Sequence, residues 1–165
     1  MAALERLEAT SKEALARRTQ SPLLCLKRML QRFTQDMPEN LVVRGKQVFS
    51  ASPALQRFAK EVGADFFSIG VFLGEERGKG GFVPSPSLVD WIAERTEKKI
   101  VVNERGEWLF LCGRDVFEES VVGGASLRGD VVVVNERGEV LGLGNAIGKK
   151  PFVKNVFDRG RYLRG

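Results

Sequence analysis

Apolar residues recur at helical spacing near the start of the chain. Residues 2–18 are rich in strong helix formers, with Leu4 and Leu7 on one side. A second helix is predicted from Pro22, with Ser21 as its N-cap and proline at the first helical position. Its apolar face repeats every three to four residues, through Leu23, Leu26, Leu30 and Phe33.

The pattern between residues 41 and 95 mixes short strands with helices. "LVVRGKQVF" predicts two strands around the turn Arg44-Gly45-Lys46, and "SPALQRFAKEVG" predicts a helix capped by Ser52 and closed by Gly63. "DFFSIGVFLGE", from Asp65, and the later "GFVP" predict further strands. A short helix is then expected from Pro86, so this region is a mixed α+β domain with about four short strands.

The pattern changes near residue 96, where helices stop and strands dominate. The segments "KKIVVNERGEWLFLCG", "GDVVVVNERGEVLGLGNAI" and "PFVKNVF" follow one another. We therefore predict an α+β protein of two domains. Residues 1–95 form an N-terminal domain of short strands and helices, and residues 96–165 form a strand-rich domain, most simply one small barrel.

The pentapeptide NERGE occurs twice, beginning at Asn103 and at Asn135. Asparagine suits the first position of a type I turn, and glycine suits the position after it, where positive φ is wanted. The flanking sequences differ, which argues against a repeated unit. We interpret the copies as two hairpin turns with solvated tips, in preference to a functional motif used twice.

Charge is concentrated at the C-terminus. The net charge is +5, and the segment from Gly148 to Gly165 holds six basic residues and one acidic residue. The remaining residues are balanced overall, although the segment up to Phe33 is also basic. A basic end on a balanced chain indicates contact with a polyanion, the alternative being a solvated charged tail.

Several classes of function are disfavoured. The chain of 165 residues has no histidine and only two cysteines, Cys25 and Cys112, so neither a metal site nor a disulfide framework is expected. No apolar run approaches the roughly 20 residues of a membrane span, and the N-terminus does not resemble a secretory signal. The glycine-rich stretch from Glu76 to Phe82 lacks the rest of a phosphate-binding loop. These features favour a non-enzymatic protein without a cofactor.

The segment Gly129–Ile147 resembles the signature of the PUA domain, an RNA-binding pseudo-barrel. That resemblance implies that residues 96–165 form a PUA-like mixed β pseudo-barrel. Gly129-Asp130 matches the entry to an apolar strand, and Gly142-Leu143-Gly144 matches the return strand. Val131 to Val134 are continuously apolar, as in a strand buried on both faces. Gly142 and Gly144 point to one face, which leaves that face open either to RNA backbone or to a barrel bend or a packed helix.

A longer part of the chain resembles one particular family of PUA-domain proteins. From Phe66 to Arg164 the chain resembles the Nip-seven ribosome biogenesis family, through "FFSIGVFLGE", "WLFLCGRDVFEESV" and "KKPFVKNVFDRGRYLR". That resemblance implies a non-catalytic factor in large ribosomal subunit assembly and precursor rRNA processing, in archaea or eukaryotes. It implies RNA and other assembly proteins as partners. The location would be the cytoplasm in an archaeon, or the nucleolus or nucleus in a eukaryote.

The resemblance also implies which residues bind RNA. The family's basic positions after the Gly-x-Gly strand correspond to Lys149, Lys150 and Lys154, within the segment that charge alone indicates. Arg161 extends the candidate set. Pro151 and Phe157 depart from it, because neither supplies a positive charge. Phe152 and Phe157 alternate with the lysines and are expected to pack inward.

Two alternatives stay open at this point. One is a translation factor or tRNA-binding protein with an appended PUA domain. The other is the accessory part of an RNA-modifying enzyme, which is disfavoured because 95 residues are few for a catalytic domain. Asp36, Asp65 and Asp90 also lie in no catalytic motif. The N-terminal domain would supply either a protein-docking face or more RNA surface.

Overall fold

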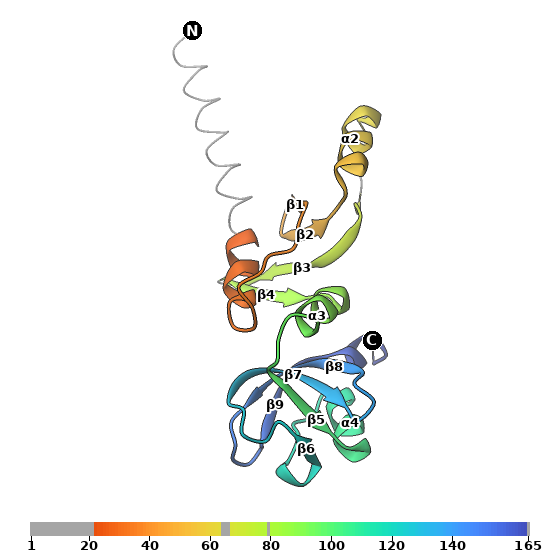
Figure 1. The fold of residues 1–165 in the computed structure, drawn as a ribbon. Helices are drawn as coiled ribbons and strands as arrows, with labels where there is room; N and C mark the ends of the chain where they lie inside the picture. Colours follow the sequence, from red (N-terminus) through yellow and green to blue (C-terminus); the bar gives the residue numbers. More distant parts are fainter. Residues whose placement is uncertain (1–21, 64–66, 79, 165) are drawn as a thin grey trace. The chain divides into compact units, whose positions relative to one another are not determined.

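The computed structural model describes residues 22–63, 67–78 and 80–164, and it divides into two compact units. The N-terminal unit contains a four-stranded antiparallel sheet in the order β1-β2-β3-β4 (Figure 1). Its strands are β1 (Leu41–Arg44), β2 (Gln47–Ser50), β3 (Val71–Arg77) and β4 (Gly81–Pro84). The predicted turn between the first two strands is confirmed, with Gly45 at a φ of 56°.

The helices of this unit follow their sequence signals. Residues 22–30 are helical, and Leu26 and Leu30 are buried, as predicted. The helix expected over residues 2–18 and the Ser21 cap lie outside the described residues. Helix α2 (Pro53–Val62) begins at Ser52, whose side chain accepts a hydrogen bond from Leu55 N, and ends at Gly63 with a φ of 62°.

One strand of the N-terminal unit starts later than expected. The predicted strand began at Asp65, but β3 begins at Val71, and residues 64–66 lie outside the described part. Gly70 precedes the strand with a φ of 65°. That left-handed conformation interrupts extended backbone, which is why residues 67–69 do not join the ladder.

The C-terminal unit comprises residues 31–36 and 86–165. It contains a five-stranded sheet in the order β6-β5-β7-β8-β9, in which β5 and β7 run parallel and the other neighbours antiparallel. The strands are β5 (Lys99–Val102), β6 (Val121–Gly123), β7 (Gly129–Asn135), β8 (Val140–Ala146) and β9 (Val153–Asp158). Its helices are α3 (Pro86–Ala93) and α4 (Glu104–Leu111), with short 3-10 turns η1 (Glu118–Ser120) and η2 (Arg159–Tyr162).

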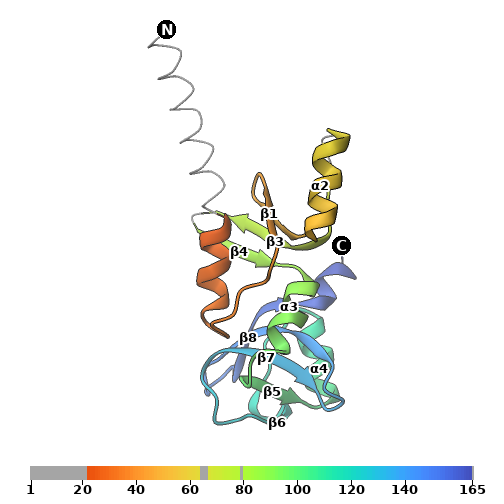
Figure 2. The ribbon, with the colours of Figure 1, turned by 45° about the horizontal axis from the view of Figure 1, so that its top comes forward.

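Both faces of β7 are buried, as its continuous apolar sequence predicts. Val131 and Val133 belong to the core inside the barrel, together with Phe110 and Val153. Side chains alternate along a strand, so Val132 and Val134 point to the outer face. Helix α3 lies along β7 and β8 there and buries Leu88, Val89, Ile92 and Ala93 (Figures 1 and 2).

Helix α3 packs with the C-terminal strands, so the C-terminal unit includes residues that the sequence pattern assigns to the N-terminal domain. The sequence places the domain boundary near residue 96, whereas the compact unit that holds the C-terminal strands also includes residues 86–95 and 31–36. Because α3 buries its apolar face against β7 and β8, it belongs to the same unit as those strands. The sequence pattern alone groups α3 with the preceding helices.

The first NERGE copy is not a hairpin, and that prediction is wrong. Asn103 caps helix α4, and its side chain accepts a hydrogen bond from Gly106 N at 3.0 Å. Trp108 to Leu111 continue this helix instead of forming a strand. The helix forms because Phe110 is completely buried, and because Gly106 lets α4 approach β5: a Cβ there would lie 2.9 Å from the Val102 Cβ.

The second copy is the predicted hairpin turn between β7 and β8. Asn135 accepts hydrogen bonds from Arg137 N at 3.0 Å and Glu139 N at 2.9 Å. Gly138 has a φ of 81°, the left-handed conformation that the turn requires. The same five residues therefore cap a helix in one place and close a hairpin in the other.

Among the helices that the structure describes, none has the length and hydropathy to cross a membrane.

Candidate nucleic-acid interface

The connection between β8 and β9 is a short projection on a fixed base. Ile147 N and Gly148 N donate to Phe152 O at 2.9 Å and 3.2 Å. Phe152 N in turn donates to Val116 O at 2.9 Å, and its side chain is buried. Lys149 and Lys150 are exposed between these anchors. The backbone that carries them is thus held from both sides.

Lys154 lies on the outer face of the sheet. Its neighbour Val153 points into the barrel core, so Lys154 points outward, and it is exposed. It pairs in register with Asn145 of β8, which pairs with Asp130 of β7. The Asn145 amide donates to the Asp130 carboxylate at 3.2 Å, and Arg32 lies 3.9 Å from that carboxylate. Asp130 is therefore already partnered and does not neutralise Lys154.

Arg128 is a basic residue of this region that the sequence interpretation missed. Its guanidinium donates to Ala125 O at 2.8 Å and Leu127 O at 2.6 Å, lies against Gly148, and stands 5.5 Å above the Phe152 ring. Arg128 immediately precedes the Gly129-Asp130 pair, so its place next to the PUA signature was the signal that could have identified it. We call the four residues Arg128, Lys149, Lys150 and Lys154 the lysine-loop surface.

Arg161 does not belong to the lysine-loop surface. It follows the opposite end of β9, where its guanidinium lies 5.6 Å from the Phe157 ring. The four residue steps from Lys154 to Asp158 span roughly 13 Å of strand. Arg161 is exposed and remains a candidate contact, but at a separate position.

The two arginines on either side of Arg161 hold the C-terminal turn in place. Arg159 forms an ion pair with Asp90 of α3. Arg164 pairs with Asp158 at 2.9 Å and donates to Leu111 O. The hydrogen bond from Arg164 to the Asp158 carboxylate raises the pKa of the arginine. These contacts give both side chains a structural role.

Gly142 and Gly144 do not leave an open face for RNA. Both are buried, and β9 covers them. A Cβ at Gly142 would overlap the Phe157 carbonyl oxygen, and one at Gly144 would lie 2.6 Å from a Val153 methyl group. Pairing irregularities occur beside Gly142 and Gly144, at Val133/Val134 and Leu143/Gly144. The glycines therefore allow the sheet to bend and pack closely, which favours the barrel bend over an open RNA-binding face.

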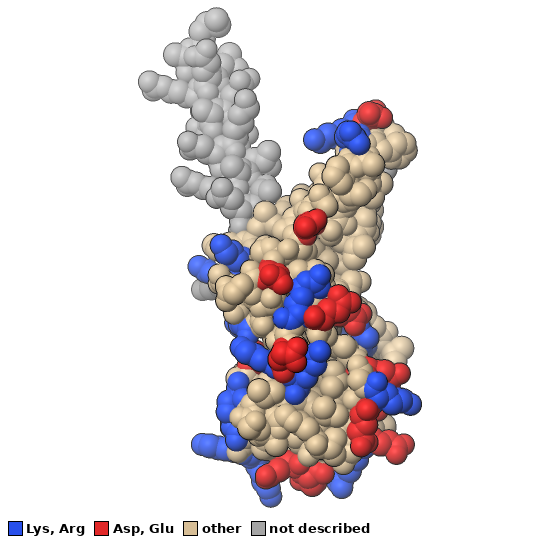
Figure 3. Space-filling model, viewed as in Figure 1, with Lys and Arg blue, Asp and Glu red and all other residues tan. Residues whose placement is uncertain are grey.

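Charge is unevenly distributed over the C-terminal unit. In Figure 3, basic side chains gather at the lower left, over the β8–β9 connection, and acidic ones lie at the right, over α4 and the β7–β8 turn, and along the lower edge. Phe152 and Phe157 are buried as predicted, so neither offers a ring on which a base could stack. Within the described residues, no three His, Cys, Asp or Glu side chains are grouped to hold a metal ion. The lysine-loop surface is thus suited to phosphate contacts.

Comparisons with known proteins agree with this geometry. Residues 98–165 match the UPF0113 PUA domain family. A UPF0113 protein of Archaeoglobus fulgidus is 40% identical over 86 residues, which cover 45% of this chain and 49% of the relative. The chain thus spans about half the length of the curated relative that it matches.

The fold has a solved counterpart. The structure of a conserved PUA domain protein from Thermoplasma acidophilum aligns with a TM-score of 0.51 and 15% identity. The alignment covers 84% of this chain and 89% of that one. PUA domains generally bind RNA, so the family match supports RNA binding at a coarse level. The structural likeness supports the α+β fold.

Proposed function

We propose that this protein is a non-catalytic RNA-binding factor that acts in large ribosomal subunit biogenesis, on precursor rRNA. The observation that carries the RNA-binding part is the lysine-loop surface, which projects from a PUA-like barrel on an anchored backbone. The resemblance to the Nip-seven family supports the assembly role. Ribosome assembly would place the protein in the cytoplasm of an archaeon or the nucleolus of a eukaryote.

The proposed contact is electrostatic and weakly selective for sequence. Lysine presents a point charge to phosphate and no planar fork to a base edge. Lys149, Lys150 and Lys154 have no ion pair within the described residues, so their charges are available to phosphates. The N-terminal unit then provides either a docking face for other assembly proteins or additional RNA surface.

Salt dependence of RNA affinity tests this mechanism. Each phosphate neutralised on single-stranded RNA adds about −0.7 to the slope of log affinity against log salt. Roughly three to four contacts give a slope of about −2 to −3. The triple variant Lys149→Ala, Lys150→Ala and Lys154→Ala should flatten the slope, weaken binding to all RNA sequences similarly, and leave the fold intact because all three side chains are exposed.

A charge-matched control separates a site from a general charge effect. The double variant Lys149→Ala and Lys150→Ala removes the same charge as Arg105→Ala and Arg114→Ala, whose side chains are exposed elsewhere on the barrel unit. Only the lysine variant should lose affinity in fluorescence anisotropy with a labelled oligonucleotide. Equal losses from both pairs would refute the assigned site.

The biological part of the proposal requires the RNA itself. Ultraviolet crosslinking in cells, followed by sequencing of the bound RNA, should recover precursor rRNA of the large subunit. Recovery of mature tRNA in its place would favour a translation factor. Incubation with bulk RNA should leave its nucleoside composition unchanged, and a modified nucleoside would contradict the non-catalytic assignment.

A further inference from the structure

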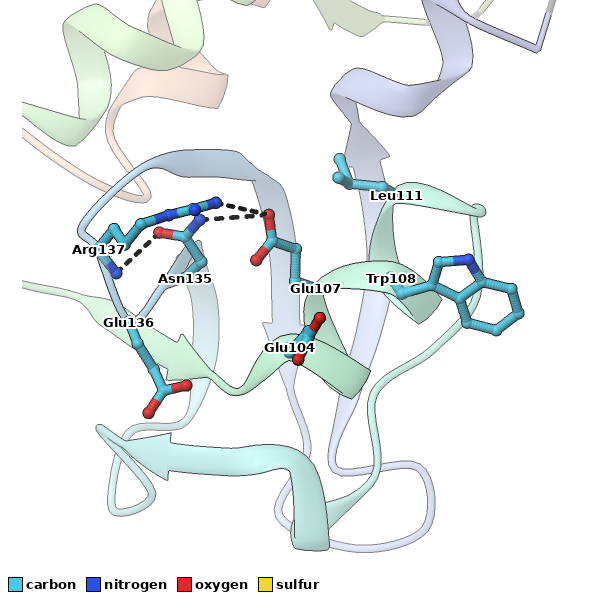
Figure 4. Close-up of a pocket in the computed structure, with 7 residues that line it drawn as sticks. All are labelled: Glu104, Glu107, Trp108, Leu111, Asn135, Glu136 and Arg137. Carbon is cyan, nitrogen blue, oxygen red and sulfur yellow. Dashed lines mark hydrogen bonds and ion pairs between the residues drawn. The ribbon is translucent and has the colours of Figure 1, made fainter.

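One face of helix α4 is turned toward the β7–β8 turn. Glu104, Glu107, Trp108 and Leu111 have the spacing i, i+3, i+4, i+7, which places them along a single stripe of the helix. Together with Asn135, Glu136 and Arg137 of the turn they line a pocket of about 490 Å³ (Figure 4). The pocket thus joins the two NERGE copies.

Parallel pairing of β5 with β7 explains why the two copies meet. Val102, the last residue of β5, lies in register with Asn135, the last residue of β7. Parallel strands that end together deliver the segments that follow them to the same edge of the sheet. Polar side chains from the two NERGE copies, 32 positions apart in the sequence, therefore line the same pocket.

Hydrogen bonds fix the inner part of this pocket. The Asn135 amide donates to Glu107 at 3.2 Å and to Glu139 at 2.6 Å. Arg137 forms ion pairs with Glu139 at 3.0 Å and with Glu107 at 3.8 Å. These side chains hold one another in place, so the inner wall is formed before any ligand arrives.

The outer part of the pocket carries unpaired negative charge. Glu104 and Glu136 are exposed and form no ion pair with any residue that the structure describes. With Glu107, three carboxylates of the lining stand against the single guanidinium of Arg137, which leaves a net charge of −2 on the lining residues. Such a field repels phosphate and attracts a cation.

Trp108 gives the pocket an aromatic rim. It lines the pocket, its side chain is 62% exposed, and the indole extends from α4 on the side away from the β7–β8 turn (Figure 4). The indole face is the best cation–π partner among side chains, and exposed tryptophans are enriched where proteins bind proteins. The other tryptophan, Trp91, already carries such a cation, with the Arg95 guanidinium 4.2 Å from its ring.

We propose that the pocket between α4 and the β7–β8 turn binds an arginine or lysine side chain from a basic, extended segment of a partner protein. The carboxylates of Glu104 and Glu136 would pair with the cation, and the Trp108 ring would cover its aliphatic stem. A cationic side chain complements the negative charge of the pocket, and its aliphatic stem complements the apolar surface of Trp108 and Leu111. This site does not depend on the lysine-loop surface and goes beyond RNA binding.

Fluorescence of Trp108 reports on this site directly. In a Trp91→Phe background Trp108 is the single tryptophan of the chain. Titration with a short acetylated and amidated peptide in which arginine alternates with glycine should change its emission saturably. The same peptide with glutamine in place of arginine should not.

A pair of acidic variants supplies the specificity test. Glu104→Gln with Glu136→Gln should weaken peptide binding about tenfold, the equivalent of 1.4 kcal/mol. Glu118→Gln with Glu119→Gln removes the same charge from exposed residues outside the pocket and should leave binding unchanged. Trp108→Ala, measured with a labelled peptide by anisotropy, should lose about fivefold in affinity. Circular dichroism should show all three proteins folded.

Four results would overturn the proposal. One is an absence of saturable change with the arginine peptide up to millimolar concentration, and another is an equal loss of affinity in the Glu118 and Glu119 control. A third is binding of the free polyamine spermidine as tightly as the peptide, which would assign the pocket to a small cation. The fourth is competition between peptide and single-stranded RNA for Trp108, which would assign the ring to base stacking. Failure of RNA binding in the lysine-loop variants bears only on the proposed function.

Discussion

The two asparagines of the NERGE copies should differ in their contribution to stability, because only one is buried. Asn103 accepts one backbone hydrogen bond, from Gly106 N at 3.0 Å. Loss of a helix N-cap of this kind costs about 1 kcal/mol. Asn135 is 3% exposed, accepts from two backbone amides, and donates to two carboxylates.

We expect Asn135→Ala to cost about 2–3 kcal/mol, at least twice the cost of Asn103→Ala, because truncation leaves partly buried donors without an acceptor. For a domain of the size of the C-terminal unit, which comprises residues 31–36 and 86–165, 1 kcal/mol shifts the melting temperature by about 4–8 °C. The Asn135 variant should therefore melt roughly 10–20 °C below the wild type. Urea unfolding followed by tryptophan fluorescence measures both variants, since Trp91 and Trp108 both lie in the C-terminal unit.

Asn135→Asp separates the two roles of this side chain. It keeps the oxygen that accepts from Arg137 N and Glu139 N, but it places a third carboxylate beside Glu107 and Glu139. The variant should be destabilised at neutral pH and should recover as the carboxylates are protonated. If Asn135→Ala costs no more than Asn103→Ala, the bridging role assigned to Asn135 is refuted.

Three further outcomes are expected. Phe110→Ala should cost roughly 3–5 kcal/mol in urea unfolding, because the ring is completely buried; a melting temperature within about a degree of the wild type would contradict this. Gly142→Ala should cost about 1–3 kcal/mol, because its Cβ would overlap the Phe157 backbone, while RNA affinity of the folded fraction stays unchanged. The hydrogen bond from Asn135 and the charge of Arg137 lower the pKa of Glu139 below 4.5. The ionised Glu139 carboxylate therefore stabilises the fold above pH 4.5, and this stabilisation is lost as the pH falls through the pKa of Glu139 in the folded protein. Asn135→Ala should raise the pKa of Glu139 in an NMR titration.

The NERGE copies show where sequence reasoning was limited. An asparagine that caps a helix and one that begins a turn do the same local chemistry, since each side chain accepts from a backbone amide two to four residues ahead. The following residues could have separated them: "WLFL" lacks the β-branched residues and glycines of "VLGLG". Four consecutive apolar residues have neither helical nor strand periodicity, and the burial of Phe110 decides the outcome.

Local patterns predicted what depends on neighbouring residues. The hairpin of β7 and β8, the Ser52 cap of α2 and the inward packing of Phe152 and Phe157 are confirmed. The burial of Gly142 and Gly144 under β9, and the pocket between α4 and the β7–β8 turn (the acidic pocket), both depend on which strands pair. The local spacing of apolar residues does not specify which strands pair. The parallel pairing of β5 with β7 in particular joins segments that the chain pattern gives no reason to bring together.

The lysine-loop surface and the acidic pocket lie at opposite ends of β7. Asp130, at the beginning of the strand, belongs to the row that includes Lys154, whereas Asn135, at its end, lines the pocket. Seven residues of strand separate the two sites by roughly 20 Å. The Debye length is about 8 Å at physiological ionic strength, so neither field reaches the other site.

Two ligands of opposite charge should therefore bind independently. Glu104→Gln with Glu136→Gln should leave RNA affinity unchanged, and Lys149→Ala with Lys150→Ala should leave affinity for the arginine peptide unchanged. Saturating peptide should shift the RNA dissociation constant by less than about twofold, since a larger coupling would require a second conformation that both ligands bias. A tenfold coupling at physiological salt would contradict the separation, because screened charges at this distance cannot supply 1.4 kcal/mol.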